Sequence, residues 1–189
     1  HIESGVILPR KGLLELKRVL TEEAEVSCCF MENNVVFWNT NQQTVLFMRL
    51  LDGEFPDYTP VIPKNNDRHI VVNRSALLDS LKRISVLSAE HSRSVKFSFE
   101  KGKLCLSSSN PKLGEAREDL DIEYPGEKIE IGFNAGYFMD VLTALQEQDD
   151  IVLELTDVLS PSLIKGKNFD GSLNIVMPMQ LGSESSYSS

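Results

Sequence analysis

Apolar and polar positions follow the same order three times along the chain. A short apolar run leads to a turn or cap residue, then to apolar residues at helical spacing, and then to three runs that alternate. The expected helices open at Pro9, Asn73 and Asn134, roughly 60 residues apart, which is typical of an internal repeat. We therefore interpret the chain as three β-α-β-β-β units.

The three expected helices each have one apolar stripe. Pro9 is suited to open the first helix, and Asn73 and Asn134 are suited to cap the second and third. The stripes consist of Leu13, Leu16 and Leu20, of Leu77, Leu81 and Ile84, and of Phe138, Val141, Leu142 and Leu145.

The alternating runs predict strands separated by turn signals such as "ENN", "EKGK" and "NFDGS". They cover residues 25–31, 34–40, 44–50, 94–100, 103–109, 115–124, 151–157, 162–166 and 173–178. Short strands of this kind form shared antiparallel sheets with helices on one face, so the expected fold class is α+β. Two units make a domain, so the second and third units pair, and the first has no partner in this chain.

This organisation predicts one and a half domains. Residues 1–51 form the isolated unit, residues 68–181 form a complete domain, and residues 182–189 are a polar tail. The connecting residues 52–67 contain Pro56, Pro60 and Pro63, which stiffen an extended linker. The chain begins at His1 without a methionine, so we expect a fragment or a processed form.

Composition narrows the possible classes of function. Hydrophobic residues make up 41% and charged residues 25%, as in ordinary globular proteins, and no apolar run is long enough to span a membrane. The net charge of −9 argues against a generally basic coat but allows a local basic surface. Three cysteines without ligand spacing favour a reducing, cytoplasmic setting, with no metal and no cofactor.

Catalytic signatures are missing from the sequence. His69 and His91 have no nearby metal-ligand partners, and no phosphate-binding loop or nucleophile motif occurs. The carboxylates of residues 115–123 fit a solvated strand or loop better than an acid–base pair. We therefore expect a non-catalytic protein, and a repeat scaffold without a role on DNA stays open as an alternative.

Several short motifs occur in one order along nearly the whole chain. They are "PRKG" at 9–12, "DGEFPDY" at 52–58, "PKN" at 63–65, "LSAE" at 87–90, "IGFNAGY" at 131–137, "DVLTAL" at 140–145 and "VMPMQL" at 176–181. Together they resemble the β sliding clamps of bacterial DNA polymerase III holoenzyme. The resemblance implies the second half of a middle domain and a whole C-terminal domain of a clamp, a ring-forming homodimer that acts as a processivity factor in the nucleoid.

Basic residues concentrate on the first two expected helices, while acidic residues lie elsewhere. Solvated helix faces would explain this pattern equally well. The resemblance favours helices that face duplex DNA and bind its phosphates without reading bases. The expected DNA-facing residues are Arg10, Lys11, Lys17, Arg74 and Lys82.

The segment "NIVMPMQL" at 174–181 has two interpretations. Alone, it fits an edge strand ended by proline, with methionine as core filler. The resemblance instead implies a groove wall that binds short linear peptides of polymerase subunits, the clamp loader and repair polymerases. The expected groove residues are Pro56, Pro60, Val61, Asn134, Tyr137, Leu159, Pro161, Ile175, Val176, Met177, Pro178, Met179 and Leu181.

The resemblance also implies a dimer interface at Arg83, Val86 and Leu87, although these residues could equally end a helix in the core. Three positions depart from the family pattern. Pro60 and Gln180 stand where some clamps have arginine, and Ser92 stands where some have a bulky aromatic residue. The charged contacts to a peptide and the width of the groove are therefore open to test.

Overall fold

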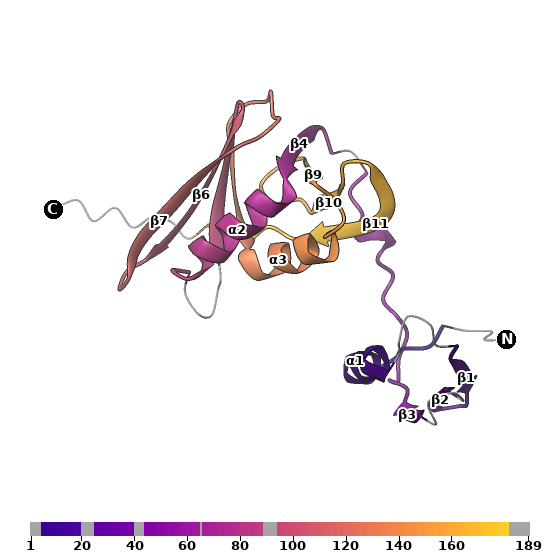
Figure 1. Ribbon diagram of the computed structural model, residues 1–189. Coiled ribbons are helices and arrows are strands. Elements are labelled where there is room, and N and C mark those ends of the chain that lie inside the picture. Colours follow the sequence, from indigo (N-terminus) through magenta and orange to yellow (C-terminus); the bar gives the residue numbers. More distant parts are fainter. Residues whose placement is uncertain (1–4, 20–24, 40–43, 65, 89–93, 182–189) are drawn as a thin grey trace. The chain divides into compact units, whose positions relative to one another are not determined.

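The computed structural model describes residues 5–19, 25–39, 44–64, 66–88 and 94–181 (Figure 1). The chain divides into two compact units, residues 1–58 and 59–189. The division falls within the stretch 52–67 that we interpreted as a linker. Ser92 and the tail 182–189 lie outside the described residues.

The first unit is one helix and one antiparallel sheet with strand order β1-β2-β3. Its elements are α1 (Arg10–Val19), β1 (Ser27–Phe30), β2 (Asn34–Asn39) and β3 (Thr44–Arg49). The carbonyl of Pro9 accepts a hydrogen bond from the Leu13 amide at 3.1 Å, so Pro9 directly precedes the helix. The expected strand before α1 is reduced to a single bridge between Ile7 and Leu51, because Pro9 has no N–H and ends the extended run.

The core of the first unit is small. Its buried residues are Val35, Met48 and Leu50, against which Leu16 of α1 packs. Leu13 was expected on the buried stripe but is 43% exposed, since three short strands offer only a narrow apolar face. Leu20 lies outside the described residues.

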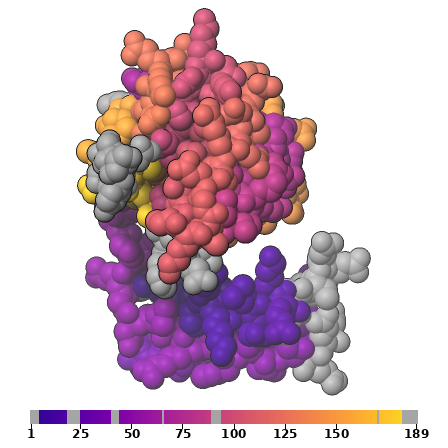
Figure 2. All heavy atoms as spheres, turned by 90° about the vertical axis from the view of Figure 1, so that its left-hand side faces the viewer, coloured from indigo at the N-terminus to yellow at the C-terminus, as the bar shows by residue number. Residues whose placement is uncertain are grey.

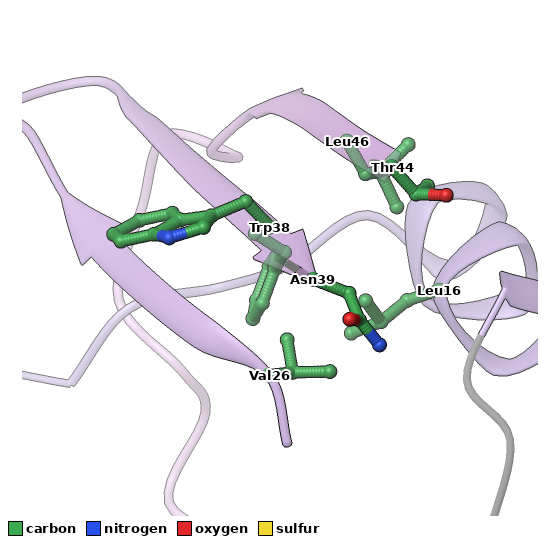
Figure 3. A pocket seen from close by; sticks show the side chains of 7 residues that line it. Leu16, Val26, Trp38, Asn39, Thr44 and Leu46 are labelled. Carbon is green, nitrogen blue, oxygen red and sulfur yellow. The ribbon is translucent and has the colours of Figure 1, made fainter. Parts of the chain in front are cut away.

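A gap of about 10 Å³ lies in this unit, where the side chains of Leu16, Val26 and Asn39 come together (Figure 3). This volume holds about one water molecule at most. The gap is therefore a packing feature and too small for a ligand site.

The second unit contains two four-stranded antiparallel sheets, with strand orders β11-β10-β9-β4 and β7-β6-β5-β8. After the short 3-10 helix η1 (Thr59–Val61), its elements are β4 (Arg68–Asn73), α2 (Arg74–Ser85), β5 (Ser94–Glu100), β6 (Lys103–Asn110), β7 (Gly114–Asp121), β8 (Ile129–Asn134), α3 (Ala135–Ala144), β9 (Asp150–Leu155), β10 (Ser162–Gly166) and β11 (Phe169–Val176). The predicted α+β class and the strand pattern are confirmed.

The two repeats of this unit exchange their first strands. β4 precedes α2 but pairs with β9, with Ile70 opposite Leu153. β8 precedes α3 but pairs with β5, with Phe97 opposite Ile131. Each sheet therefore needs both repeats, which explains why two β-α-β-β-β units make one domain.

Both helices pack on the same side of these sheets and lie next to each other (Figure 1). The expected stripe residues Leu77, Leu81 and Ile84 are fully buried, as are Phe138 and Leu142. The sheets contribute alternate residues to this core. No helix of the described residues lies on the other face of each sheet, which we call the outer face.

The predicted helix caps of the second unit are confirmed. The side-chain oxygen of Asn73 accepts a hydrogen bond from the Ala76 amide at 3.0 Å, and that of Asn134 accepts one from the Gly136 amide at 2.9 Å. Each cap satisfies an amide that the helix cannot pair internally. The asparagines therefore fix where α2 and α3 begin.

Candidate functional site

A hollow of about 260 Å³ lies between the last described residues and the outer face of β8. We call it the C-terminal hollow. It is lined by Glu130, Ile131, Gly132, Val158, Leu159, Met179, Gln180 and Leu181. Leu159 is 70% exposed and Leu181 38% exposed, so much of the lining is apolar surface open to solvent. Such a concave apolar surface is suited to binding side chains of a partner.

Backbone pairing positions the C-terminal segment beside β8. The Met179 amide donates a hydrogen bond to the Gly132 carbonyl at 2.7 Å, which forms an isolated antiparallel bridge. A Cβ at position 132 would lie 2.7 Å from the Met179 carbonyl oxygen and 2.9 Å from Leu181. Glycine is therefore required for this close approach.

Asp157 shapes the part of the lining that Val158 and Leu159 supply. Its carboxylate accepts hydrogen bonds from the backbone amides of Leu159 and Ser160 at 2.8 and 2.7 Å, and from the Ser160 hydroxyl at 2.8 Å. The bond from the Leu159 amide is the main cause that lowers the pKa of Asp157. This turn holds the Leu159 side chain out of the core at the hollow.

Of the expected groove residues, Leu159, Met179 and Leu181 line the C-terminal hollow. Val176 is only 4% exposed and packs in the core, so its side chain anchors β11 and offers little surface to a partner. Asn134 is engaged as the cap of α3. Tyr137, in the first turn of α3, is 62% exposed.

The remaining expected groove residues do not line this hollow. Ile175, Pro161 and Pro178 are half-buried, and Met177 is 53% exposed. Pro60 and Val61 belong to the exposed helix η1 of the second unit. Pro56 belongs to the first unit, where it is exposed.

Sequence reasoning missed the β8 side of the hollow, which Glu130, Ile131 and Gly132 supply. One signal was available, because Gly132 interrupts an otherwise apolar strand within "IGFNAGY". A glycine inside a strand often marks the close approach of another backbone. Gln180 had been noted only as a departure from the family pattern, and Val158 had no comparable signal, since its contribution depends on the fold.

The expected DNA-facing residues differ in their surroundings. Arg10, Lys11 and Lys17 are exposed on α1. Lys82 is exposed on α2 and forms an ion pair with Asp79 at 3.2 Å. Arg74 is half-buried and donates hydrogen bonds to the carbonyls of Gln148 at 2.8 Å and Leu142 at 3.2 Å, so it joins the start of α2 to the end of α3.

The expected dimer-interface residues lie at the end of α2. Arg83 makes two hydrogen bonds of 2.6 Å to the Glu118 carboxylate on β7. These bonds lower the pKa of Glu118 and raise that of Arg83. Val86 is 75% exposed, and β7 is the outer edge of its sheet on the face seen in Figure 2. Exposed apolar residues and edge strands that have no further partner strand among the described residues are both typical of contact surfaces.

Neither a metal site nor a membrane-spanning helix is found in the part of the chain that the structure describes. No group of three His, Cys, Asp or Glu side chains there is placed to hold a metal ion. No helix among those residues is long and apolar enough to cross a membrane.

Comparison with known proteins gives a consistent result. Residues 59–180 match the family model for the DNA polymerase III beta subunit, C-terminal domain, and residues 1–57 match the model for its central domain. The beta sliding clamp of Pseudomonas putida is 37% identical over 177 residues, covering 93% of this chain and 47% of that protein. The chain therefore spans about half the length of the curated relatives it matches.

Solved structures show the same likeness. A sliding clamp from Bartonella birtlesii bound to griselimycin is 37% identical with a TM-score of 0.87, and the match covers 95% of this chain and 48% of that one. A C. crescentus beta sliding clamp with PEG bound to a putative beta-motif tethering region is 31% identical with a TM-score of 0.84, covering 95% and 48%. The fold and these matches define a DNA-clamp protein. The chain belongs to the DNA polymerase III beta subunit family, the beta sliding clamps.

Proposed function

We propose that this chain is part of a sliding clamp, a non-catalytic ring that encircles duplex DNA and gives a replicative polymerase its processivity. Membership of the beta subunit family supports this role. In this proposal, residues 1–51 form the second half of a middle domain, residues 52–67 the linker and residues 68–181 the C-terminal domain. The boundaries of the family matches and the division of the chain near residue 58 support that assignment.

Partners would bind through short linear peptides at the C-terminal hollow. The observation that carries this proposal is the apolar surface of Leu159, Met179 and Leu181, held open beside β8 by the Gly132 contact. Methionine is flexible and polarizable, which suits a surface that accepts several partners. Relatives of known structure bind griselimycin in one case and PEG at a putative tethering region in another, which is consistent with a ligand groove.

Fluorescence polarisation of a labelled Gln-x-x-Leu-x-Phe-like peptide tests the groove. We expect saturable binding that weakens about tenfold or more in Leu159→Ala, because a buried apolar anchor dominates such contacts. Leu113→Ala is the matched control, since Leu113 is 64% exposed and lies between β6 and β7, away from the hollow lining. A wild-type chain that does not bind, or an equal loss in the control, would contradict the proposal.

The DNA-facing role is proposed for Arg10, Lys11, Lys17 and Lys82, whose side chains are exposed. We also keep Arg74 in the DNA-facing set, because it lies at the start of α2. Its guanidinium already donates hydrogen bonds to the carbonyls of Leu142 and Gln148, so we expect a smaller contribution from it. Replacing Arg10 and Lys11 with glutamate in a full-length clamp should weaken DNA retention and reduce its salt dependence. Unchanged retention across a salt series would contradict this role.

The ring contact is proposed at the end of α2, with exposed Val86 and neighbouring Leu87 as apolar contacts and Arg83 fixed by Glu118. In a full-length clamp, Val86→Glu should shift the dimer toward monomer in sedimentation velocity. Burying an unpaired charge at the centre of an apolar contact weakens association, and the contacts around it do not offset that loss of binding free energy. Val158→Glu, a similar change at another exposed valine, should leave the dimer intact.

A further inference from the structure

A second hollow, of about 310 Å³, lies on the outer face of β10 and β11. We call it the β11 hollow. It is lined by Leu163, Lys165, Gly171, Ser172 and Leu173. None of these residues lines the C-terminal hollow.

An irregularity in strand pairing creates the β11 hollow. Ile164 lies opposite Asn174, but Gly166 lies opposite Phe169, so β11 has extra residues between these two pairs. Such bulges bend a strand and redirect its side chains, and they are frequent next to functional sites. The hollow is therefore a consequence of the strand's own geometry.

Specific contacts hold the bulge in place. The Asn174 side-chain amide donates hydrogen bonds to the Ile164 carbonyl at 3.1 Å and to the Ser172 hydroxyl at 3.3 Å. The Phe169 ring lies over Gly171, where a Cβ would clash with it. These side-chain contacts stabilise the bulge, so the hollow is already formed before a partner binds.

The lining of the β11 hollow combines polar and apolar residues, and exposed apolar side chains lie in it and beside it. Leu173 is 49% exposed and Phe169 is 42% exposed. Ile175 pairs with Leu163 on the outer face, and Met177 follows it at 53% exposed. The charged lining residue, Lys165, forms an ion pair with Glu154 at 2.7 Å. The apolar residues therefore continue along β11 toward the C-terminal hollow.

We propose that the β11 hollow receives a second large apolar side chain of the same peptide that binds in the C-terminal hollow. This inference rests on the proposed function. Leu173 and Met179 are six residues apart in the chain, so they are separated by at most about 20 Å. An extended peptide with two apolar anchors about seven residues apart therefore reaches both hollows.

A linear peptide fits this surface better than a second copy of the chain. The exposed apolar residues form a narrow strip along one strand and continue into the C-terminal hollow. A stable interface between two folded chains buries about 800 Å² on each partner, which requires a broad patch. A strip of one strand's width matches one extended segment.

The test compares two labelled peptides on the intact chain by fluorescence polarisation. Both contain the Gln-x-x-Leu-x-Phe-like core and a Gly/Ser extension, and one of them has a leucine in that extension, at the seventh residue counted from the core. Two such pairs are made, one with the extension before the core and one with the extension after it. We expect the leucine peptide of one pair to bind about tenfold more tightly, as burial of one large apolar side chain allows.

Leu173→Ser should remove this gain and leave the affinity for the plain peptide unchanged, and Leu113→Ser should change neither. Phe169→Ser, a second exposed position, should reduce the gain as well. Equal affinities in both pairs, or a gain that survives Leu173→Ser, would overturn the inference while the groove itself stands. If no core peptide binds, the proposed function and this inference both fail. Self-association that Leu173→Ser abolishes would overturn the inference in favour of a second copy.

Discussion

The two units of the chain begin from the same repeat but bury very different amounts of apolar surface. In the second unit, two repeats exchange strands and enclose Phe97, Phe133 and Phe138 in direct ring contact. In the first unit, the buried apolar residues among those described are Val35, Met48 and Leu50. One repeat therefore makes the elements, and only two repeats together make a full core.

The outer face of the sheet that contains β5 and β8 also differs from the first unit's sheet, on the face away from that unit's buried residues. In the second unit, the outer face of β5 and β8 has ion-paired lysines and glutamates, such as Lys96 with Glu130 at 3.8 Å. In the first unit, Val45 is 68% exposed and Phe47 is 61% exposed. Neighbouring exposed apolar residues on a sheet are typical of a surface that contacts a partner or another part of the protein. We propose that further parts of a complete clamp cover the first unit.

The largest expected difference is in the unfolding of the two units. Trp38, the single tryptophan, lies on β2 and reports on the first unit. Its fluorescence transition in urea should come at least about 1 M before the far-UV circular dichroism transition of the second unit, since a smaller buried area gives a smaller free energy of unfolding. Coincident transitions would show that the units unfold as one.

Removing a core ring should affect the second unit most. Phe97→Ala leaves a cavity between Phe133 and Phe138 and should lower the free energy of unfolding by about 3–5 kcal/mol. Phe47→Ala in the first unit is the control, with about 0.5 kcal/mol or less, because that ring is 61% exposed. Urea unfolding followed by circular dichroism measures both, and similar losses would contradict the comparison.

Gly132→Ala should disturb the C-terminal hollow with a moderate cost. The added Cβ would meet the Met179 carbonyl at 2.7 Å, and overpacking of this kind costs about 1–3 kcal/mol. We expect about tenfold weaker peptide binding with the rest of the second unit folded. Gly5→Ala has open space around the new methyl group and should bind normally. Normal binding by Gly132→Ala would show that the C-terminal segment does not need this contact.

The side-chain caps distinguish the helices of the second unit from α1, which follows Pro9 directly. Asn73→Ala should lower the free energy of unfolding of the second unit by about 1 kcal/mol, because the Ala76 amide loses its acceptor. Asn73→Ser, which keeps an acceptor, should lose less than half of that. Equal losses in thermal or urea unfolding would mean that the cap oxygen is not the cause.

The smallest effect concerns pH. The Arg83 contact lowers the pKa of Glu118 in the folded state, so its stabilisation is present above the unfolded pKa and is lost as pH falls through the folded pKa. The loss should therefore come below about pH 4 and be small, because the Arg83 side chain is exposed and solvent screens the pair. Glu118→Gln should lack this component of the acid-induced loss in unfolding experiments, and identical pH profiles would contradict it.

Much of this fold could be predicted from local patterns. The alternation at 94–100 and 103–109 marks β5 and β6, and the spacing of Leu77, Leu81 and Ile84 marks the buried side of α2. Asn73 and Asn134 act as caps because a short polar side chain reaches the free amides of the first turn. These features depend on residues close in sequence, so the pattern alone is informative.

The candidate site was less predictable. Met179 and Leu181 were identified through the family resemblance, but Val176 next to them packs in the core. Arg74 was expected to face DNA, and the sequence did not predict that its guanidinium also binds the carbonyls of Leu142 in α3 and of Gln148 just after it. In each case the environment comes from a distant part of the chain, which no local pattern specifies.

The sequence by itself determined the repeated order of elements, the caps and the class of fold, because these follow from periodicity and local hydrogen bonding. Tertiary structure alone decided the strand exchange between repeats, since β4 must cross to β9 and β8 to β5. It also decided the two hollows, which arise where the Gly132 backbone meets Met179 and where β11 bulges against β10. Both depend on contacts between segments far apart in the chain, whose free energy appears only once the core has formed.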